Sequence, residues 1–212
     1  GARPVAAAYR NLVDHLGGVD AVVLVDGGTD SLMRGDEQGL GTPEEDSVSL
    51  YAVNRLEGVP TKLLACIGFG IDTFHSVCHA HFLESVAALA MKGAYLGAWS
   101  LLPQMPEAEA YRAAVEFVHA KMFNHPSIVN TSILSAVEGR FGNYHANYRT
   151  DGSELFINPL MSLYWGFDAV AVAERNLYLD LLATTETIPD VWKTLAAFRA
   201  GVTPREWVSL PM

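Results

Sequence analysis

The chain has 212 residues, of which half are apolar and 18% are charged, and its mean hydropathy is positive. This composition is typical of one folded domain with a sizeable core and excludes a disordered chain. The formal net charge of −10 argues against nucleic acid or an anionic membrane as the main partner, because both bind basic surfaces. Two cysteines are too few for a disulfide scaffold and favour a reducing compartment, so we predict a cytoplasmic protein.

Predicted helices and strands alternate through the first 122 residues. The expected order is a helix at 5–16, a strand at 20–26, a helix at 43–56, a strand at 62–67, a helix at 73–92, a strand at 94–99 and a helix at 107–122. The strands are apolar throughout, which is typical of a parallel sheet covered on both faces. We therefore predict an α/β fold with a Rossmann-like three-layer α/β/α arrangement, a mostly parallel sheet and a single domain over residues 1–212.

The start of the chain has an unusual order of elements. The first predicted strand follows a helix almost directly, and this order usually continues a βαβ unit whose first strand comes earlier. We therefore expect an N-terminal strand or glycine-rich segment that is missing ahead of Gly1.

The last third of the chain is less regular. Residues 127–130 suit a short strand or a loop ahead of a helix at 132–138, and residues 139–153 suit a loop or a hairpin. Residues 159–167 suit either a strand or a buried helix. Helices are expected at 168–182 and 189–199.

A long acidic, glycine-rich loop follows the first predicted strand at residues 27–42. Its sixteen residues exceed the usual 2–6 of a βα connection, and long loops in compact domains are often functional. Ligands of open parallel sheets bind beyond the carboxyl ends of the strands, where this loop begins. The loop is therefore the first candidate site.

The side chains of this loop suit a polar or metal-bound ligand. Carboxylates at Asp26, Asp30 and Asp36 would bind a hard cation such as Mg²⁺ or sugar hydroxyls, and Arg34 would orient a carboxylate or phosphate. The paired glycines would let the backbone approach the ligand. The predicted contacts here are Asp26, Gly27, Gly28, Thr29, Asp30, Arg34 and Asp36.

The acids that close the loop have a simpler interpretation. Thr42 with Glu45 fits a capping box around a proline at the first helical position, and acids in the first turn suit the helix dipole. On this ground we exclude Glu44, Glu45 and Asp46 from the candidate site.

The second predicted strand leads to Gly68-Phe-Gly-Ile-Asp72 and then to several histidines. In a helix at 73–92, positions 75, 78 and 79 would share one face, with His75 and His79 at the end nearest the sheet edge. Asp72 would orient one ring, which suits general acid–base catalysis. Two alternatives stay open, namely a zinc site that includes Cys78 but has no evident fourth ligand, and histidines simply packed at a helix start.

Asn130 completes the predicted ligand contacts. It stands between an apolar run and a predicted helix start, where Thr131 would be the N-cap.

Four segments resemble the DUF1152 family of uncharacterised archaeal and bacterial proteins. They are VDGGTDSLMRGDEQGLGTPEED at residues 25–46, IGFGID at 67–72, VEGRFG at 137–142 and INPLM at 157–161. The resemblance covers nearly the whole chain and implies a Rossmann-like three-layer fold. It also implies a longer protein with a glycine-rich strand and loop ahead of this region, and it implies no particular reaction.

Three functional hypotheses follow. In the first, the chain is an enzyme that binds a small polar metabolite, such as a nucleotide or phosphorylated sugar, with Asp30, Asp72, His75 and His79 as catalytic residues. In the second, the same cleft belongs to a non-catalytic ligand-sensing or binding module. In the third, the aromatic segment at 161–167 forms a homo-oligomer interface. Convergence of Asp30, Asp36, Asp72 and His75 on one cleft would favour catalysis over mere binding.

Overall fold

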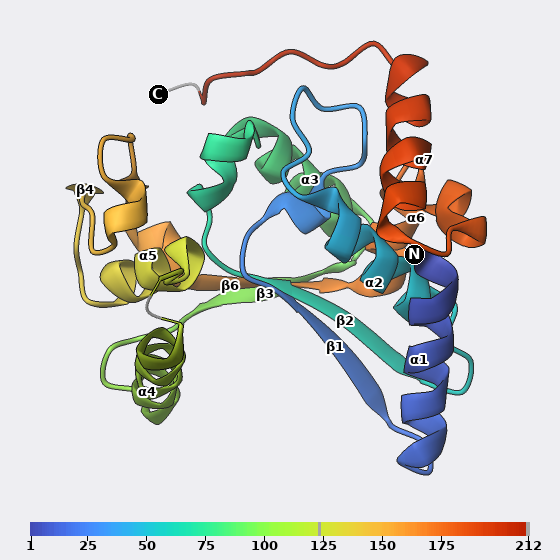
Figure 1. Cartoon of the computed structure of the whole chain (residues 1–212), viewed down its shortest axis with the longest axis horizontal. Helices are drawn as coiled ribbons and strands as arrows, with labels where there is room; N and C mark the ends of the chain where they lie inside the picture. Colours follow the sequence, from blue (N-terminus) through green and yellow to red (C-terminus); the bar gives the residue numbers. More distant parts are fainter. Residues whose placement is uncertain (123, 211–212) are drawn as a thin grey trace.

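The computed structural model describes every residue except 123, 211 and 212. Its longer elements are α1 (Ala2–His15), β1 (Ala21–Asp26), α2 (Pro43–Asn54), β2 (Thr61–Cys66), α3 (His79–Met91), β3 (Tyr95–Ser100), α4 (Pro106–Lys121), α5 (Ile128–Val137), β4 (Gly142–Asn143), β5 (Phe156–Ile157), β6 (Leu163–Asp168), α6 (Ala169–Arg175) and α7 (Ile188–Ala200) (Figure 1). Short 3₁₀ helices are η1 (Asp30–Leu32), η2 (Ile71–His75), η3 (Tyr148–Thr150), η4 (Pro159–Ser162) and η5 (Leu179–Thr184). None of the described helices combines the length and the apolar character needed to cross a bilayer.

The main sheet has four strands in the order β1-β2-β6-β3. β1 and β2 are parallel, whereas β6 is antiparallel to both of its neighbours. Three strands therefore point the same way and β6 runs against them, so the fold is α/β with a mixed sheet. The prediction of a mostly parallel sheet needs this correction. Phe167 of β6 is fully buried opposite Leu64, and a central strand is apolar on both faces whichever direction it runs.

The main core lies on one face of the sheet. Buried side chains of β2, α3 and β6, including Leu64, Phe82 and Phe167, form its centre, and residues of α2, α6 and α7 pack around them. The opposite face is open along β1, where Val23 and Val25 are 51% and 65% exposed. The predicted three-layer cover is thus absent along this edge of the described chain.

The segment after β2 departs most from the prediction. The helix expected at 73–92 begins only at His79, after the η2 turn. Ser76 has a left-handed backbone with φ of 64°, which an α-helix cannot continue through, and Cys78 is extended. Positions 75, 78 and 79 therefore do not share a helix face, contrary to the prediction.

In the last third, the structure decides the alternatives at 139–153 and 159–167, whereas residues 128–130, expected as a short strand or a loop, already belong to α5. Residues 159–167 form η4 and then β6, and β4 pairs with β5 in a short hairpin. The helix before the hairpin starts earlier than expected, because Ser127 and not Thr131 is the N-cap, and the Asn130 N–H donates to Ser127 Oγ at 3.2 Å. The helix expected at 168–182 ends at Arg175.

Candidate functional site

The loops that follow β1 and β2 meet at the carboxyl edge of this parallel strand pair. The backbone N–H of Thr29 donates to Asp72 Oδ2 at 2.7 Å, and the Thr29 hydroxyl lies 3.4 Å from the same oxygen. Both residues are buried. Gly28 permits this approach, because a Cβ added there would lie only 2.7 Å from Asp72 Oδ2. The neighbouring Gly27 packs beside Val129 of α5.

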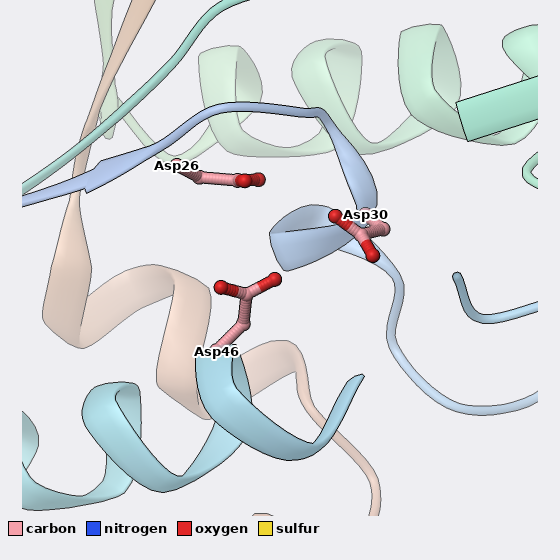
Figure 2. Close-up of side chains that lie close together, drawn as sticks. All are labelled: Asp26, Asp30 and Asp46. Carbon is pink, nitrogen blue, oxygen red and sulfur yellow. The ribbon is translucent and has the colours of Figure 1, made fainter. Parts of the chain in front are cut away.

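Three aspartates converge beside this junction. Asp26 ends β1, Asp30 begins η1 and Asp46 lies in the first turn of α2, and Figure 2 shows their side chains pointing toward one another. One carboxylate oxygen from each lies within 4.8 Å of the others. Oxygens at this spacing can ligate one hard cation, which takes carboxylate ligands at about 2.0–2.6 Å. We call these three residues the aspartate cluster.

Local hydrogen bonds set the direction of two of these side chains. Asp30 Oδ2 accepts the Thr42 N–H at 2.7 Å and lies 3.2 Å from the Thr42 hydroxyl. Asp26 Oδ2 accepts the Ser31 N–H at 3.3 Å. Gly41 is packed directly against Asp30 with φ of +71°, so no larger residue fits at this position.

The electrostatics of the cluster are unfavourable to its ionised form. Burial, followed by the charge of Asp30, raises the pKa of Asp26 to about 6 and that of Asp72 to about 7. Burial and the charges of Asp26 and Asp30 raise the pKa of Asp46 to about 9. In the described part of the chain, no Lys, Arg or His forms an ion pair with these four aspartates. A bound cation would supply the missing positive charge.

A buried hydroxyl also faces the cluster. Ser31 is 8% exposed, and its Oγ makes no hydrogen bond of normal geometry, although its side chain lies close enough to Asp26 to lower the pKa of that carboxyl. Ser31, Asp26 and Asp46 line a pocket of about 200 Å³ between β1 and α2, with Tyr9 and Ser49 farther along its wall. The pocket therefore offers oxygen atoms and room for a small ligand.

The comparison with protein families identifies the chain. A family model described as "Protein of unknown function (DUF1152)" matches residues 1–203. The chain belongs to the DUF1152 family. This confirms the family resemblance drawn from the sequence motifs. No curated protein and no solved structure matches the chain. The family description names no activity, and the fold of a DUF1152 chain does not by itself determine one.

Asp46 is the member of the cluster that sequence reasoning excluded. The α2 helix does begin with Pro43 and acids in its first turn, but Thr42 makes no side-chain cap hydrogen bond and instead contacts Asp30. Asp46 lies on the same helical face as the buried Leu50 and Val53, at spacings of four and seven residues. That spacing is the sequence signal that points Asp46 toward the core.

Two predicted ligand contacts of the loop lie in a separate group of charges. Asp36 is 3.4 Å from Arg34 Nε and 3.0 Å from Arg205 Nε, so both of its neighbours are arginines. Glu37, which follows it, is fully buried and contacts Arg205 at 3.1 Å. In the DUF1152 chain Arg34 and Asp36 therefore neutralise each other and stand apart from the aspartate cluster.

The two candidate histidines have different surroundings. His75 is exposed at the end of η2 beside Phe74. His79 is half-buried, with its ring 5.1 Å from that of Phe69 and its Nε2 3.3 Å from Thr73 Oγ1, and burial lowers its pKa. His79 and Asp72 line one small gap that has no room for a water-sized ligand.

The zinc alternative has no geometric support among the described residues. The three aspartates are the only group there that brings three metal-ligating side chains together. The thiol of Cys78 instead donates to the carbonyl of Val208 at 3.2 Å.

Asn130 is engaged between two helices. Its Oδ1 accepts the Tyr111 hydroxyl at 2.5 Å and its Nδ2 donates to Ser127 Oγ at 3.1 Å. The first of these bonds joins α4 to α5, the second lies within the first turn of α5, and Asn130 is not among the residues of the aspartate cluster.

Proposed function

We propose that this DUF1152 protein is an enzyme that binds a small phosphate-bearing metabolite through a divalent cation held by Asp26, Asp30 and Asp46. The convergence of these three carboxylates, without a paired basic side chain in the described chain, is the observation that carries the proposal. The Ser31 hydroxyl beside Asp26 in the same pocket adds a further oxygen that a cation or its water can contact.

The ligand atoms favour a hard cation. Three carboxylates and a hydroxyl provide only oxygen, which suits Mg²⁺, Mn²⁺ or Ca²⁺ better than a thiophilic metal. Mg²⁺ usually keeps several waters and takes one or two carboxylates together with substrate phosphates. An open pocket beside the cluster agrees with such partial coordination by the protein.

The charge of the site favours a phosphate that is bridged by the cation. In their ionised form the aspartates would repel a nucleotide or sugar phosphate, and Arg34 is already paired with Asp36. A cation between the carboxylates and the phosphate removes this repulsion. Within this proposal Asp72 is the group that moves a proton, because it lies beside the cluster and is fixed by Thr29.

The binding-module hypothesis also has an observation in its favour. His75 and Asp36, two of the four residues whose convergence would favour catalysis, lie apart from the aspartate cluster. The same cation site would then serve recognition without turnover. Release of product from a panel of phosphorylated metabolites distinguishes the two hypotheses.

Divalent-cation binding is the first test of the proposal. Thermal unfolding is followed with MgCl₂ or MnCl₂, against NaCl of matched ionic strength, for the wild type and the variants Asp30→Asn and Asp46→Asn. Asp14→Asn, an exposed position on α1, is the matched control. A site filled at 100 times its Kd stabilises the native state by about 2.7 kcal/mol.

We expect the divalent shift in the wild type and in Asp14→Asn, and its loss in the two cluster variants. An equal shift in all four proteins, or none in the wild type at 10 mM cation, contradicts the proposal.

We retain the finer fold and context expectations as proposals. They are a Rossmann-like three-layer fold, a cytoplasmic location, a small-molecule ligand in place of nucleic acid or membrane, and homo-oligomerisation as an open alternative. The shared direction of β1, β2 and β3 supports the first, and two free cysteines support the second.

A further inference from the structure

After α7 the chain crosses the loop of residues 33–42 as an extended segment (Figure 1). We call residues 203–208 the strap and residues 33–42 the acidic loop. The Arg205 N–H donates to the Asp36 carbonyl at 2.7 Å, and the Trp207 N–H donates to Gln38 Oε1 at 2.9 Å. The strap is thus attached to the acidic loop by its backbone.

The Arg205 side chain strengthens this attachment. Its Nε lies 3.0 Å from Asp36, its Nη2 3.1 Å from Glu37 and its Nη1 2.5 Å from Glu84 of α3. Glu37 also accepts the N–H groups of Arg34 and Gly35, at 3.0 and 2.8 Å. Among the described residues, Arg205 is the only cation paired with this fully buried carboxylate.

Removal of Arg205 would therefore have a specific local cost. A buried carboxylate that loses its ionic partner is destabilised strongly, because the low-dielectric interior does not solvate the charge. The acidic loop has no helix or strand of its own beyond one bridge between Glu37 and Arg205, so it would absorb that cost by moving.

The strap also contacts the start of α3. The Trp207 ring lies edge-on to that of His79, with 6.2 Å between the ring centres. The Cys78 thiol donates to the Val208 carbonyl at 3.2 Å, and the Val208 N–H lies 3.5 Å from the same sulfur. Close by, Gly39 of the acidic loop is packed against Ser76, the one non-glycine residue with positive φ in the described chain. The strap therefore lies where the loop that follows β1 meets the loop that follows β2.

The acidic loop ends at the aspartate cluster. Its last residue, Thr42, donates its N–H to Asp30, and Gly41 packs against the same carboxylate. Four residues lie between Thr42 and Glu37, where Arg205 holds the loop. The guanidinium of Arg199 secures the same stretch through the carbonyls of Gly35 and Glu37 at 2.8 and 2.6 Å.

We propose that the strap positions the candidate cation site, with Arg205 as a positioning residue for Asp30. Arg205 holds Glu37, Glu37 fixes the acidic loop, and the loop presents the Thr42 N–H that orients the Asp30 carboxylate. The role in cation binding rests on the proposed function, whereas the role in ordering Thr42 does not.

Two measurements on Arg205→Ala test this proposal. The first is hydrogen exchange of the Thr42 amide without metal, and the second is Mn²⁺ affinity by titration at a temperature where every variant is folded. Arg205→Lys keeps the charge but not the planar fork. Arg55→Ala, which removes a remote exposed ion pair with Asp180, is the control.

We expect Thr42 to exchange at least tenfold faster in Arg205→Ala, and Mn²⁺ affinity to fall about tenfold, as it does when groups that orient metal ligands are removed. Arg205→Lys should recover part of both losses, and Arg55→Ala should match the wild type. A merely structural role would lower the melting temperature and leave the Mn²⁺ affinity of the folded protein unchanged.

Unchanged Thr42 exchange in a folded Arg205→Ala overturns the proposal. If that variant does not fold, Glu84→Gln replaces it, since it removes only the exposed partner of Arg205, and the expected acceleration is two- to threefold. Absence of Mn²⁺ binding in the wild type would refute the proposed function alone, and the Thr42 amide would then decide the positioning role by itself.

Discussion

The DUF1152 chain carries two groups of acids within twenty-one residues, and they differ in their counter-charges. Asp36 and Glu37 are paired with Arg34 and Arg205 at 3.0–3.4 Å. The aspartate cluster has no such partner in the described chain, and burial, together with the charges of neighbouring acids, raises the pKa values of Asp26 and Asp46. The difference shows that burial of acids alone does not identify a functional site. The paired acids hold the loop, whereas we propose that the unpaired acids receive a cation.

The largest effect is expected at the paired group. Glu37→Gln puts an amide where a carboxylate accepts two backbone N–H groups and the Arg205 guanidinium. Breaking a buried pair in this way costs about 3–5 kcal/mol. Urea unfolding of the variant measures the loss. A loss below about 0.5 kcal/mol in the free energy of unfolding would contradict the distinction between the paired acids and the aspartate cluster.

The unpaired group predicts a dependence of stability on pH. The folded-state pKa values of Asp26 and Asp72, about 6 and 7, lie above 3.8, so the folded protein holds protons that the unfolded chain releases. This contribution is complete below about pH 4 and is lost as the pH rises through 6 and 7.

The free energy of unfolding of the metal-free protein should therefore fall, by on the order of 4 kcal/mol between pH 5 and 8. Saturating Mg²⁺ should reduce the fall, because the cation stabilises the ionised carboxylates. Urea titrations at each pH, with EDTA or with MgCl₂, measure both curves. If the metal-free protein instead became more stable as the pH rises, the raised pKa values of these aspartates would be contradicted.

Substitution within the aspartate cluster should stabilise the metal-free protein. Asp46→Asn removes the carboxyl whose pKa is raised most. At pH 8 the folded protein keeps this carboxyl protonated whereas the unfolded chain releases the proton, so we expect a gain on the order of 1 kcal/mol or more, together with loss of the divalent shift. Thermal unfolding with and without MgCl₂ gives both values. A purely structural Asp46 would instead give a less stable variant.

The smallest effect is expected at Asp36. Asp36→Asn removes a partly buried partner of two arginines but keeps an oxygen that accepts from Arg205, so the expected loss is about 0.5–1 kcal/mol. The divalent shift should stay within the error of the wild-type value. Asp36→Asn should therefore lower the free energy of unfolding of the metal-free protein, whereas Asp46→Asn should raise it. Changes of the same sign would contradict the distinction between the paired and the unpaired acids.

The sequence predicted most of the fold because its apolar runs are local signals. The bounds of β1, β2 and β3 and of α4 agree with prediction within one or two residues. The direction of β6 was not predictable in this way, since its neighbours β2 and β3 precede it by at least sixty residues and a buried strand is apolar in either direction.

The candidate site was only partly predictable. Asp26 ends a predicted strand and Asp30 follows it, at the sheet edge where ligands of such sheets bind, and this position made both residues candidates. Asp46 was missed because helix capping gave a sufficient local explanation, and the bend at Ser76 has no signal in the residue itself. The Glu37–Arg205 pair joins positions 168 residues apart, which no local pattern shows.

A crystal grown or soaked in MnCl₂ tests the central claim most directly, because Mn²⁺ is located by its anomalous scattering. The account predicts one strong peak between Asp26, Asp30 and Asp46, at about 2.0–2.3 Å from an oxygen of each. The peak should be absent from Asp46→Asn crystals under the same conditions. No peak at the cluster in the wild type, or a peak only at other acids, would contradict the account.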